Sequence, residues 1–288
     1  MRVGFAGLGR MGALMARNIA ASGAELSVWN RTASKAHAFA VAHGCEAAET
    51  PRALADAADV VVTMLADDEA SSEVHHGLDG LLAASRCGTF IEMGTVSPDH
   101  IAALGNTAGP SVRVIDAPVS GATQAADAAQ LLIMAGCTED EAAPFATLFG
   151  AMGKKTICLG APGAGAVMKL AVNSLIHGMN QTLAEALVLS EAAGIAPGAA
   201  FDVIEASAAA APMFSYRRPL YLDEADHDVS FTVALARKDM QLAGDLARAL
   251  GTRMPQGDVT LDLLGDAERH GYAARDMAAM LDYMRKGS

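Results

Sequence analysis

Near its N-terminus the chain contains the glycine-rich segment Gly7-Leu8-Gly9-Arg10-Met11-Gly12. It follows the apolar run Val3–Ala6 and opens a helical pattern, so it lies between a predicted strand and a predicted helix. In such a turn the first glycine allows a tight bend, the second lets the backbone approach a pyrophosphate, and the third lets the helix pack on the strand. The helix N-terminus then offers free N–H groups to phosphates. The motif alone is weak evidence, but a second strand behind it at Leu26–Trp29 strengthens the prediction of a dinucleotide-binding site.

The second strand ends in Trp29-Asn30-Arg31-Thr32, which indicates the type of dinucleotide. An NAD enzyme usually has Asp or Glu here, because a carboxylate accepts hydrogen bonds from the ribose hydroxyls. Asn30 is neutral and Arg31 is cationic, and a guanidinium binds a 2′-phosphate bidentately. Thr32 adds a hydroxyl and a candidate helix N-cap. The sequence therefore predicts NADP. There are two alternatives: the enzyme also uses NAD, or Arg31 is only a solvated residue at a helix start.

The first half of the chain alternates predicted strands with predicted helices. The strands are Val3–Ala6, Leu26–Trp29, Val60–Leu65, Thr89–Met93, Val112–Asp116, Leu131–Ala135 and Thr156–Leu159. The helices between them are Arg10–Ala21, Thr32–Ala42, Pro98–Leu104 and Glu139–Met152. This alternation predicts an α/β fold, a Rossmann-type doubly wound parallel sheet.

The second half is predicted to be helical throughout. The proline-free stretch from Ala164 to Ala193 predicts one long helix of ~45 Å, at about 1.5 Å per residue. Further helices are predicted at Pro197–Ala206, Phe231–Leu250 and Met254–His270. We therefore expect an NADP-binding domain in residues 1–161 and an all-α domain for substrate binding and oligomerisation in residues 162–288, in a homodimer or homotetramer.

The composition fits a globular protein and narrows its partners. Of 288 residues, 52% are hydrophobic and 19% are charged, which allows a sizeable core. The formal net charge of −12 disfavours a nucleic-acid or anionic-membrane surface, which needs a basic field. The four cysteines form no CxxC or Cys/His cluster, so we expect free thiols and no metal site. No signal peptide and no apolar run of about 18 residues is evident, so we expect a cytoplasmic protein.

Four further segments carry a resemblance to a known family. They are Gly94-Thr95-Val96-Ser97-Pro98, Asp116-Ala117-Pro118-Val119-Ser120-Gly121, the run from Gly163 to Asn173, and Lys238-Asp239. In this order and spacing, together with the glycine turn, they make the chain similar to the β-hydroxyacid dehydrogenase family, which includes 3-hydroxyisobutyrate dehydrogenase, tartronate semialdehyde reductase and the NADP-dependent glyoxylate/succinic semialdehyde reductases. The resemblance covers essentially the whole chain.

Lys169 is the candidate catalytic residue. It lies in an otherwise apolar part of the predicted long helix, and Asn173 follows one turn later on the same face. A lysine in a partly desolvated cleft has a lowered pKa and exchanges protons near neutral pH. Taken by itself, the spacing favours a lysine that snorkels from an amphipathic helix. The resemblance instead implies that Lys169 is the general acid/base and that Asn173 supports the substrate and the lysine.

The resemblance also implies where the substrate binds. Ser120 and Gly121, expected in a turn after a strand, would hold a substrate carboxylate, although an ordinary Ser-Gly turn is the alternative. Ala122 stands where a second glycine is common in the family, and its methyl group would narrow the pocket or stiffen the turn. The resemblance also implies that Asp239 is a substrate-binding residue.

The remaining implied residues concern the cofactor. Met64, Leu65 and Thr95 resemble the segments near the nucleotide and the nicotinamide, and Phe231 and Lys238 match the C-terminal pattern. Phe231 and Lys238 are seven residues apart, so they are expected on one face of a helix; helix packing and a surface Lys-Asp pair are the alternative. His75 and His76 are expected between helices, with no acid or thiol beside them to favour a metal. His177, eight residues after Lys169, either lines the cleft or is a core or interface histidine.

We therefore expect an oxidoreductase that transfers hydride between NADP(H) and a small carboxylate, a β-hydroxyacid or a semialdehyde. Two alternatives stay open. The first is an imine reductase, which shares the fold and the cofactor but generally lacks the lysine. The second is a non-catalytic NADP-binding module. The sequence leaves the substrate, the strictness of NADP over NAD and the preferred direction open.

Overall fold

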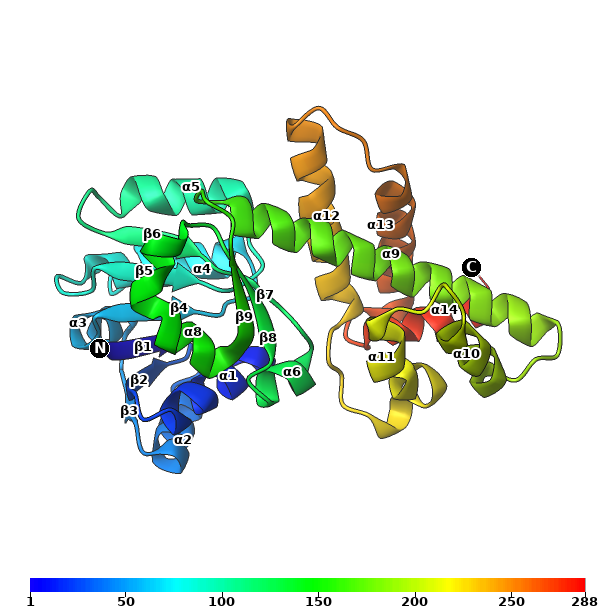
Figure 1. Cartoon of the computed structure of the whole chain (residues 1–288), viewed down its shortest axis with the longest axis horizontal. Helices are drawn as coiled ribbons and strands as arrows, with labels where there is room; N and C mark the ends of the chain where they lie inside the picture. The colour runs from blue at the N-terminus through cyan, green and yellow to red at the C-terminus, as the bar shows by residue number, and fades with distance from the viewer. Residues whose placement is uncertain (288) are drawn as a thin grey trace. The chain divides into compact units, whose positions relative to one another are not determined.

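The computed structural model describes residues 1–287, which form two compact units, Met1–Lys169 and the part from Leu170 onward (Figure 1). The border between the units falls within one helix, α9 (Ala164–Ala192). Within the described residues, no helix is both long and apolar enough to cross a membrane.

The first unit is built on a six-stranded parallel sheet with the order β3-β2-β1-β4-β5-β6. Its strands are β1 (Arg2–Ala6), β2 (Glu25–Trp29), β3 (Glu46–Ala47), β4 (Val60–Thr63), β5 (Thr89–Glu92) and β6 (Arg113–Asp116). The connecting helices are α1 (Arg10–Ala21), α2 (Ala33–His43), α3 (Pro51–Ala57), α4 (Asp68–His76) and α5 (Pro98–Thr107). The strand order reverses between β1 and β4, and ligands of such sheets bind at the carboxyl ends of the strands beside this point. The Rossmann-type prediction is confirmed.

The strands after β6 form a second, smaller sheet, which the sequence analysis did not predict. It contains β7 (Val119–Ser120), β8 (Leu131–Ala135) and β9 (Gly153–Cys158), with β7 antiparallel to β8 and β8 parallel to β9. Two of the predicted strands, Leu131–Ala135 and Thr156–Leu159, therefore belong to this second sheet and not to the parallel sheet. Pro118 lies two residues after the end of β6 and has no N–H to donate to a ladder, so the chain leaves the first sheet there.

Two helix predictions in the first unit need correction. The predicted helix Glu139–Met152 is divided into α7 (Glu139–Ala142), a 3₁₀ turn (Ala143–Phe145) and α8 (Ala146–Met152). Pro144 lies at the division, and it cannot supply the N–H that a continuous helix needs. His75 and His76 lie in the last turn of α4 and not between helices. The short α6 (Thr123–Asp127) was not predicted.

The second unit is built from helices around its own core. After α9 come α10 (Pro197–Ala206), α11 (Pro212–Leu222), α12 (Val233–Ala249), α13 (Pro255–Ala267) and α14 (Met280–Lys286), with short 3₁₀ turns at Glu224–Asp226 and Met277–Ala279 and a π turn at Glu268–Tyr272. The core packs large side chains from several helices, such as Leu187, Phe201, Tyr221, Met240 and Leu264. The prediction of a helical second half with one long helix is confirmed.

His75 makes the stability of the first unit depend on pH. Its side chain is 1% exposed, contacts the Phe90 ring edge-on and lies with Nδ1 2.9 Å from the Ser71 carbonyl oxygen. Burial lowers the pKa of His75 from 6.5 to about 4. The unfolded chain therefore binds a proton before the folded chain does, so the stabilisation is present above pH 6.5 and is lost as the pH falls towards 4.

We expect the free energy of unfolding to fall between pH 7 and pH 4 by about 3 kcal/mol more in the wild type than in His75→Leu, which has no titrating side chain. Urea unfolding followed by the fluorescence of Trp29, the one tryptophan, measures this in the first unit. Equal pH dependence in the two proteins would contradict the prediction.

Candidate functional site

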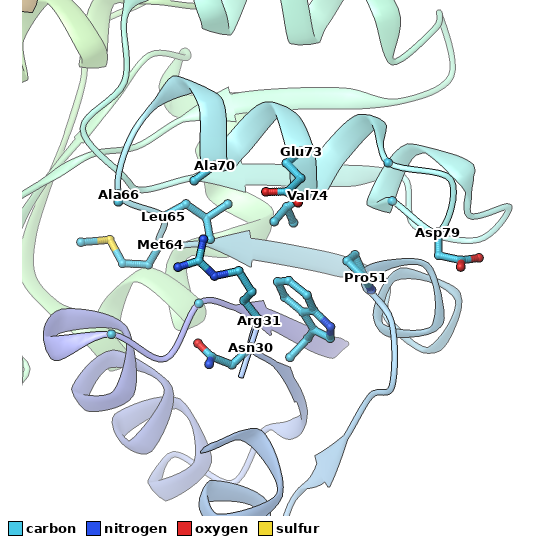
Figure 2. Close-up of a pocket in the computed structure, with 15 residues that line it drawn as sticks. Asn30, Arg31, Pro51, Met64, Leu65, Ala66, Ala70, Glu73, Val74 and Asp79 are labelled. Carbon is cyan, nitrogen blue, oxygen red and sulfur yellow. The ribbon is translucent and has the colours of Figure 1, made fainter. Parts of the chain in front are cut away.

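A pocket of about 450 Å³ opens at the carboxyl ends of the central strands of the first unit (Figure 2). Gly7 follows β1, Asn30 and Arg31 follow β2, and Met64 and Leu65 follow β4. All of these predicted cofactor residues line the pocket, as does Gly9. The structure thus gathers in one place residues that lie up to 58 positions apart (65 − 7) in the sequence.

The glycine turn is shaped by close backbone contacts. Gly7 has φ 103°, and a methyl group there would lie 2.4 Å from the Met64 carbonyl oxygen. A methyl group at Gly12 would lie 1.9 Å from the Gly7 carbonyl oxygen. A methyl group at Gly9, in contrast, would meet nothing within 4 Å, so the space above Gly9 is open to a ligand. Two of the three glycines are required by the protein itself.

The start of α1 suits a phosphate. Gly9 is the N-cap and has no side chain with which to cap the first turn, and this turn contains no acidic residue. Its N–H groups and the helix dipole therefore favour an anion. The exposed Arg10 and the half-buried Met11 begin this helix, so both lie beside the turn, as predicted. With the open space above Gly9, this part of the pocket fits the pyrophosphate of a dinucleotide.

Asn30 holds the turn in shape. The Leu8 backbone N–H donates to Asn30 Oδ1 at 3.0 Å, and Asn30 Nδ2 donates to the Thr32 carbonyl at 3.2 Å. The Leu8 N–H is therefore already paired, and the amide of Asn30 connects the ends of β1 and β2. Sequence analysis placed Asn30 in the pocket but did not foresee this bond. Thr32 is the N-cap residue of α2, but its hydroxyl makes no capping hydrogen bond.

Arg31 is exposed and extends across the pocket towards Leu65 (Figure 2). Two acidic residues, Glu73 and Asp79, also line the pocket, farther from Asn30. Arg31 is thus the cation of the lining. A phosphate held there gains a charge-assisted hydrogen bond that an uncharged ribose hydroxyl does not.

The loop after β5 carries Thr95 and is anchored by a buried acid. Met93 N donates to the Thr63 carbonyl at 2.9 Å, so this loop begins beside the Met64-Leu65 segment. Glu92, 1% exposed, accepts hydrogen bonds from the Ser71 hydroxyl at 2.6 Å and from Gly94 N at 3.2 Å. Burial raises the pKa of Glu92, and these hydrogen bonds oppose that rise. Thr95 itself is half-buried.

Ser120 ends β7, so it lies within a strand and not in the turn that was expected. Gly121 follows it, and Ala122 is the N-cap residue of α6. Ser120 and Ala122 are half-buried, and Gly121 is exposed. The three predicted substrate residues thus mark a sharp change from strand to helix in the first unit.

Lys169 lies in the second turn of α9 and is half-buried. Ala166, three residues before it, and Leu170, the next residue, are buried, at 2% and 1% exposed. The predicted long helix that carries Lys169 is confirmed. Asn173 follows four residues later on the same helix and is 3% exposed.

In the second unit, two of the predicted site residues, Asn173 and Lys238, contact the carboxylate of a third, Asp239. Asn173 Nδ2 donates to Asp239 Oδ2 at 2.5 Å, and Lys238 Nζ lies 3.0 Å from Asp239 Oδ1. Asp239 is 1% exposed, so this is not the surface Lys-Asp pair of the alternative interpretation. Phe231 belongs to the same group through His177, whose ring stacks on it at 5.5 Å.

Phe231 is held differently from what the sequence predicted. It precedes α12, because the Thr232 side chain caps the helix by accepting from Leu235 N at 3.2 Å. Phe231 N donates to Asp276 Oδ2 at 3.1 Å, and Met277 N donates to the Phe231 carbonyl at 2.8 Å. The predicted start of this helix at Phe231 was therefore wrong, and the segment at Asp276 fixes Phe231.

His177 is a member of this group that the sequence analysis left as a core or interface histidine. It is 3% exposed, and its Nε2 lies 3.8 Å from Asp239 Oδ2. Neither ring nitrogen has a hydrogen-bond partner in the described part of the chain. The one available signal was its spacing of eight residues from Lys169. Within residues 1–287, no cluster of three or more His, Cys, Asp or Glu side chains is placed to hold a metal ion.

Both halves of the chain match known families. Residues 2–160 match the NAD binding domain of 6-phosphogluconate dehydrogenase, and residues 163–284 match the family described as NAD-binding of NADP-dependent 3-hydroxyisobutyrate dehydrogenase. The chain belongs to the 3-hydroxyisobutyrate dehydrogenase family. It is therefore an NAD(P)-dependent enzyme of the β-hydroxyacid dehydrogenase and semialdehyde reductase type.

Individual members of the 3-hydroxyisobutyrate dehydrogenase family are similar over their full length. Glyoxylate/succinic semialdehyde reductase 1 of Arabidopsis thaliana is 30% identical, over 99% of both chains. The NAD-dependent L-serine dehydrogenase of Pseudomonas aeruginosa is 31% identical, over 97% of this chain and 96% of its own. The solved structure of Mycobacterium tuberculosis 3-hydroxyisobutyrate dehydrogenase with L-serine is 29% identical with a TM-score of 0.85, covering 99% of this chain and all of that one.

Asn30→Ala tests the cofactor pocket of this family member. Because the variant removes the acceptor for Leu8 N, we expect affinity for NADH and NADPH to fall alike, by about ten-fold for the loss of one well-formed hydrogen bond. Quenching of Trp29, which lines the pocket, measures both. Asn106→Ala on the exposed face of α5 is the control. Affinities within two-fold of the wild type in Asn30→Ala would show that Asn30 does not shape the turn.

Proposed function

We propose that this enzyme transfers hydride between NADP(H) and a small β-hydroxyacid or semialdehyde that carries a carboxylate. The observation that carries the proposal is Lys169, a half-buried lysine among apolar neighbours in the same unit as the nucleotide pocket. The family membership supports the reaction class. On this proposal residues 1–161 bind NADP, and residues 162–288 contribute to substrate binding and oligomerisation.

Each proposed role follows from the chemistry of a side chain. Bound NADPH supplies the hydride, which the carbonyl carbon of the substrate accepts. The Lys169 ammonium donates a proton to the carbonyl oxygen as its negative charge develops, and in the oxidative direction neutral Lys169 takes the proton from the hydroxyl. Ser120 and Gly121 bind the carboxylate through a hydroxyl and a backbone N–H. Asn173, oriented by its hydrogen bond to Asp239, supports the substrate and the lysine.

Lys169→Ala tests the chemical role. We expect kcat to fall about 10³-fold, because a general acid contributes about 10²–10⁴. NADPH affinity should stay within two-fold of the wild type, since Lys169 is not among the residues that line the nucleotide pocket. NADPH oxidation with glyoxylate and with succinic, tartronate and methylmalonate semialdehydes measures turnover. Lys154→Ala, an exposed lysine of β9, is the control. Near-wild-type kcat in Lys169→Ala would overturn the role.

Arg31 supports the preference for NADP over NAD. It is the cation of the pocket lining, and the acid that would bind ribose hydroxyls is replaced by Asn30, whose oxygen is paired with Leu8 N. On this proposal the guanidinium binds the 2′-phosphate. Lys238 and Phe231 are proposed as further contacts of the cofactor, on the resemblance alone.

Arg31→Asp tests this preference. We expect the affinity for NADPH to fall about 100-fold, since a bidentate charged contact is lost and a repulsive carboxylate is gained. The affinity for NADH should change little. Lys35→Asp, an equal charge change four residues away on the exposed face of α2, controls for general electrostatics. If both coenzymes weakened alike in Arg31→Asp, the proposed 2′-phosphate contact would be wrong.

We propose a class of substrates and not a single compound. The relatives are named for glyoxylate, succinic semialdehyde and L-serine, which share a carboxylate and an oxidisable or reducible carbon. The proposal for this chain is a carboxylate of that size. The methyl group of Ala122 would limit bulk beside the carboxylate.

A homodimer or homotetramer is proposed from the apolar surface of the long helix. Leu175 and Leu189 of α9 are 65% and 74% exposed in the single chain. Large apolar side chains gathered on one surface favour burial against a partner. We also propose a cytoplasmic location, on the ground that all four cysteines are free thiols.

A further inference from the structure

Asp116 is a fully buried carboxylate at the end of β6, 0% exposed. Its backbone carbonyl accepts a hydrogen bond from Gly136 N at 2.7 Å, which ties the end of β6 to the end of β8. The sequence analysis used Asp116 only as part of a motif and gave it no role.

Both carboxylate oxygens of Asp116 accept N–H groups from the start of α9. Gly163 N donates to Oδ1 at 2.8 Å, and Ala166 N donates to Oδ2 at 2.8 Å. Backbone N–H groups at a helix start have no partner within the helix. The segment Ala161-Pro162-Gly163 offers no side chain that caps a helix. Asp116 therefore caps α9 from a strand 47 residues before Gly163.

The backbone fits closely around this carboxylate. A methyl group at Gly136 would lie 2.1 Å from Asp116 Oδ1, and one at Gly165 would lie 2.8 Å from Oδ2. Two glycines thus allow the segment after β8 and the first turn of α9 to touch the carboxylate. These contacts leave the side chain little room to move, and they hold the first turn of α9 against the end of β6.

The two segments that Asp116 joins carry the residues proposed for the reaction. Ser120 follows Asp116 by four residues, and Lys169 follows Ala166 by three, about one helical turn. We propose that Asp116 is a positioning residue that holds Lys169 relative to the Ser120–Gly121 segment. This inference rests on the proposed function, because it concerns the transfer of a proton from Lys169 to a substrate held at Ser120. A displacement of about 1 Å at such a group costs about 10²-fold in rate.

Asp116→Asn tests the positioning role. The amide has nearly the shape of the carboxylate, but its NH₂ group must face a backbone N–H that now has no acceptor. We expect kcat to fall about 100-fold with NADPH affinity, measured through Trp29, within two-fold of the wild type. The primary deuterium isotope effect on kcat with NADPH labelled at C4 should rise, because a misplaced lysine makes the chemical step slower than product release.

The matched control is Thr138→Ala, which removes the capping box of α7 in the same unit. It should lower Tm as the loss of a helix cap does, and leave kcat and the isotope effect at their wild-type values. If Asp116→Asn does not fold, Asp116→Ser replaces it, since a hydroxyl is smaller and still accepts one hydrogen bond.

The outcomes separate the two proposals. A wild type without NADPH-dependent turnover on the panel contradicts the proposed function. An active wild type with wild-type kcat and isotope effect in folded Asp116→Asn contradicts positioning alone. Positioning is also contradicted if Asp116→Asn behaves like Thr138→Ala, with a lowered Tm only, or if neither Asp116 variant folds, because Asp116 then serves stability.

Discussion

The close approach of Gly12 to the carbonyl of Gly7 is the constraint on which the nucleotide end of the molecule depends. With no side chain at either position, α1 begins close to the end of β1, and the space above its N-cap residue, Gly9, is open. The hydrogen bond from Leu8 N to Asn30 then fixes the end of β2 against the same turn. This arrangement brings Arg31 and the Met64-Leu65 segment around one pocket. The shape of the cofactor pocket therefore depends on the absence of side chains at Gly7 and Gly12.

Features that rest on local pattern could be predicted from the sequence. The glycine turn, the bounds of α1 and α10 and the length of α9 follow from short-range spacing, and the structure agrees with them. The second sheet could not be predicted in the same way, because β7 has only two residues and pairs with a strand eleven residues beyond it. The start of α12 was missed although Thr232 is a good N-cap residue, since the apolar Phe231 was assigned to the helical pattern.

The sequence predicted most residues of the candidate site, but it did not predict the hydrogen bonds and ion pairs that join them. Asn173, Lys238 and Asp239 were chosen by resemblance, and the second unit joins them around one buried carboxylate. His177 was not assigned to the site, because a histidine at helical spacing has the same sequence pattern in a core as in a site; only its contacts with Phe231 and Asp239 distinguish it. Asp116 was hidden for a similar reason, since its partners at α9 lie 47 and 50 residues away.

On the proposed function, this enzyme moves a hydride from NADPH to the carbonyl carbon of a small carboxylate. The most direct measurement is mass spectrometry of the product formed from glyoxylate or a semialdehyde of the panel with NADPH deuterated on the transferred face of C4. We expect a hydroxyacid that carries one deuterium on the former carbonyl carbon, in one-to-one proportion to the NADPH consumed. Consumption of NADPH with no deuterium in the product, or no hydroxyacid from any substrate, would contradict it.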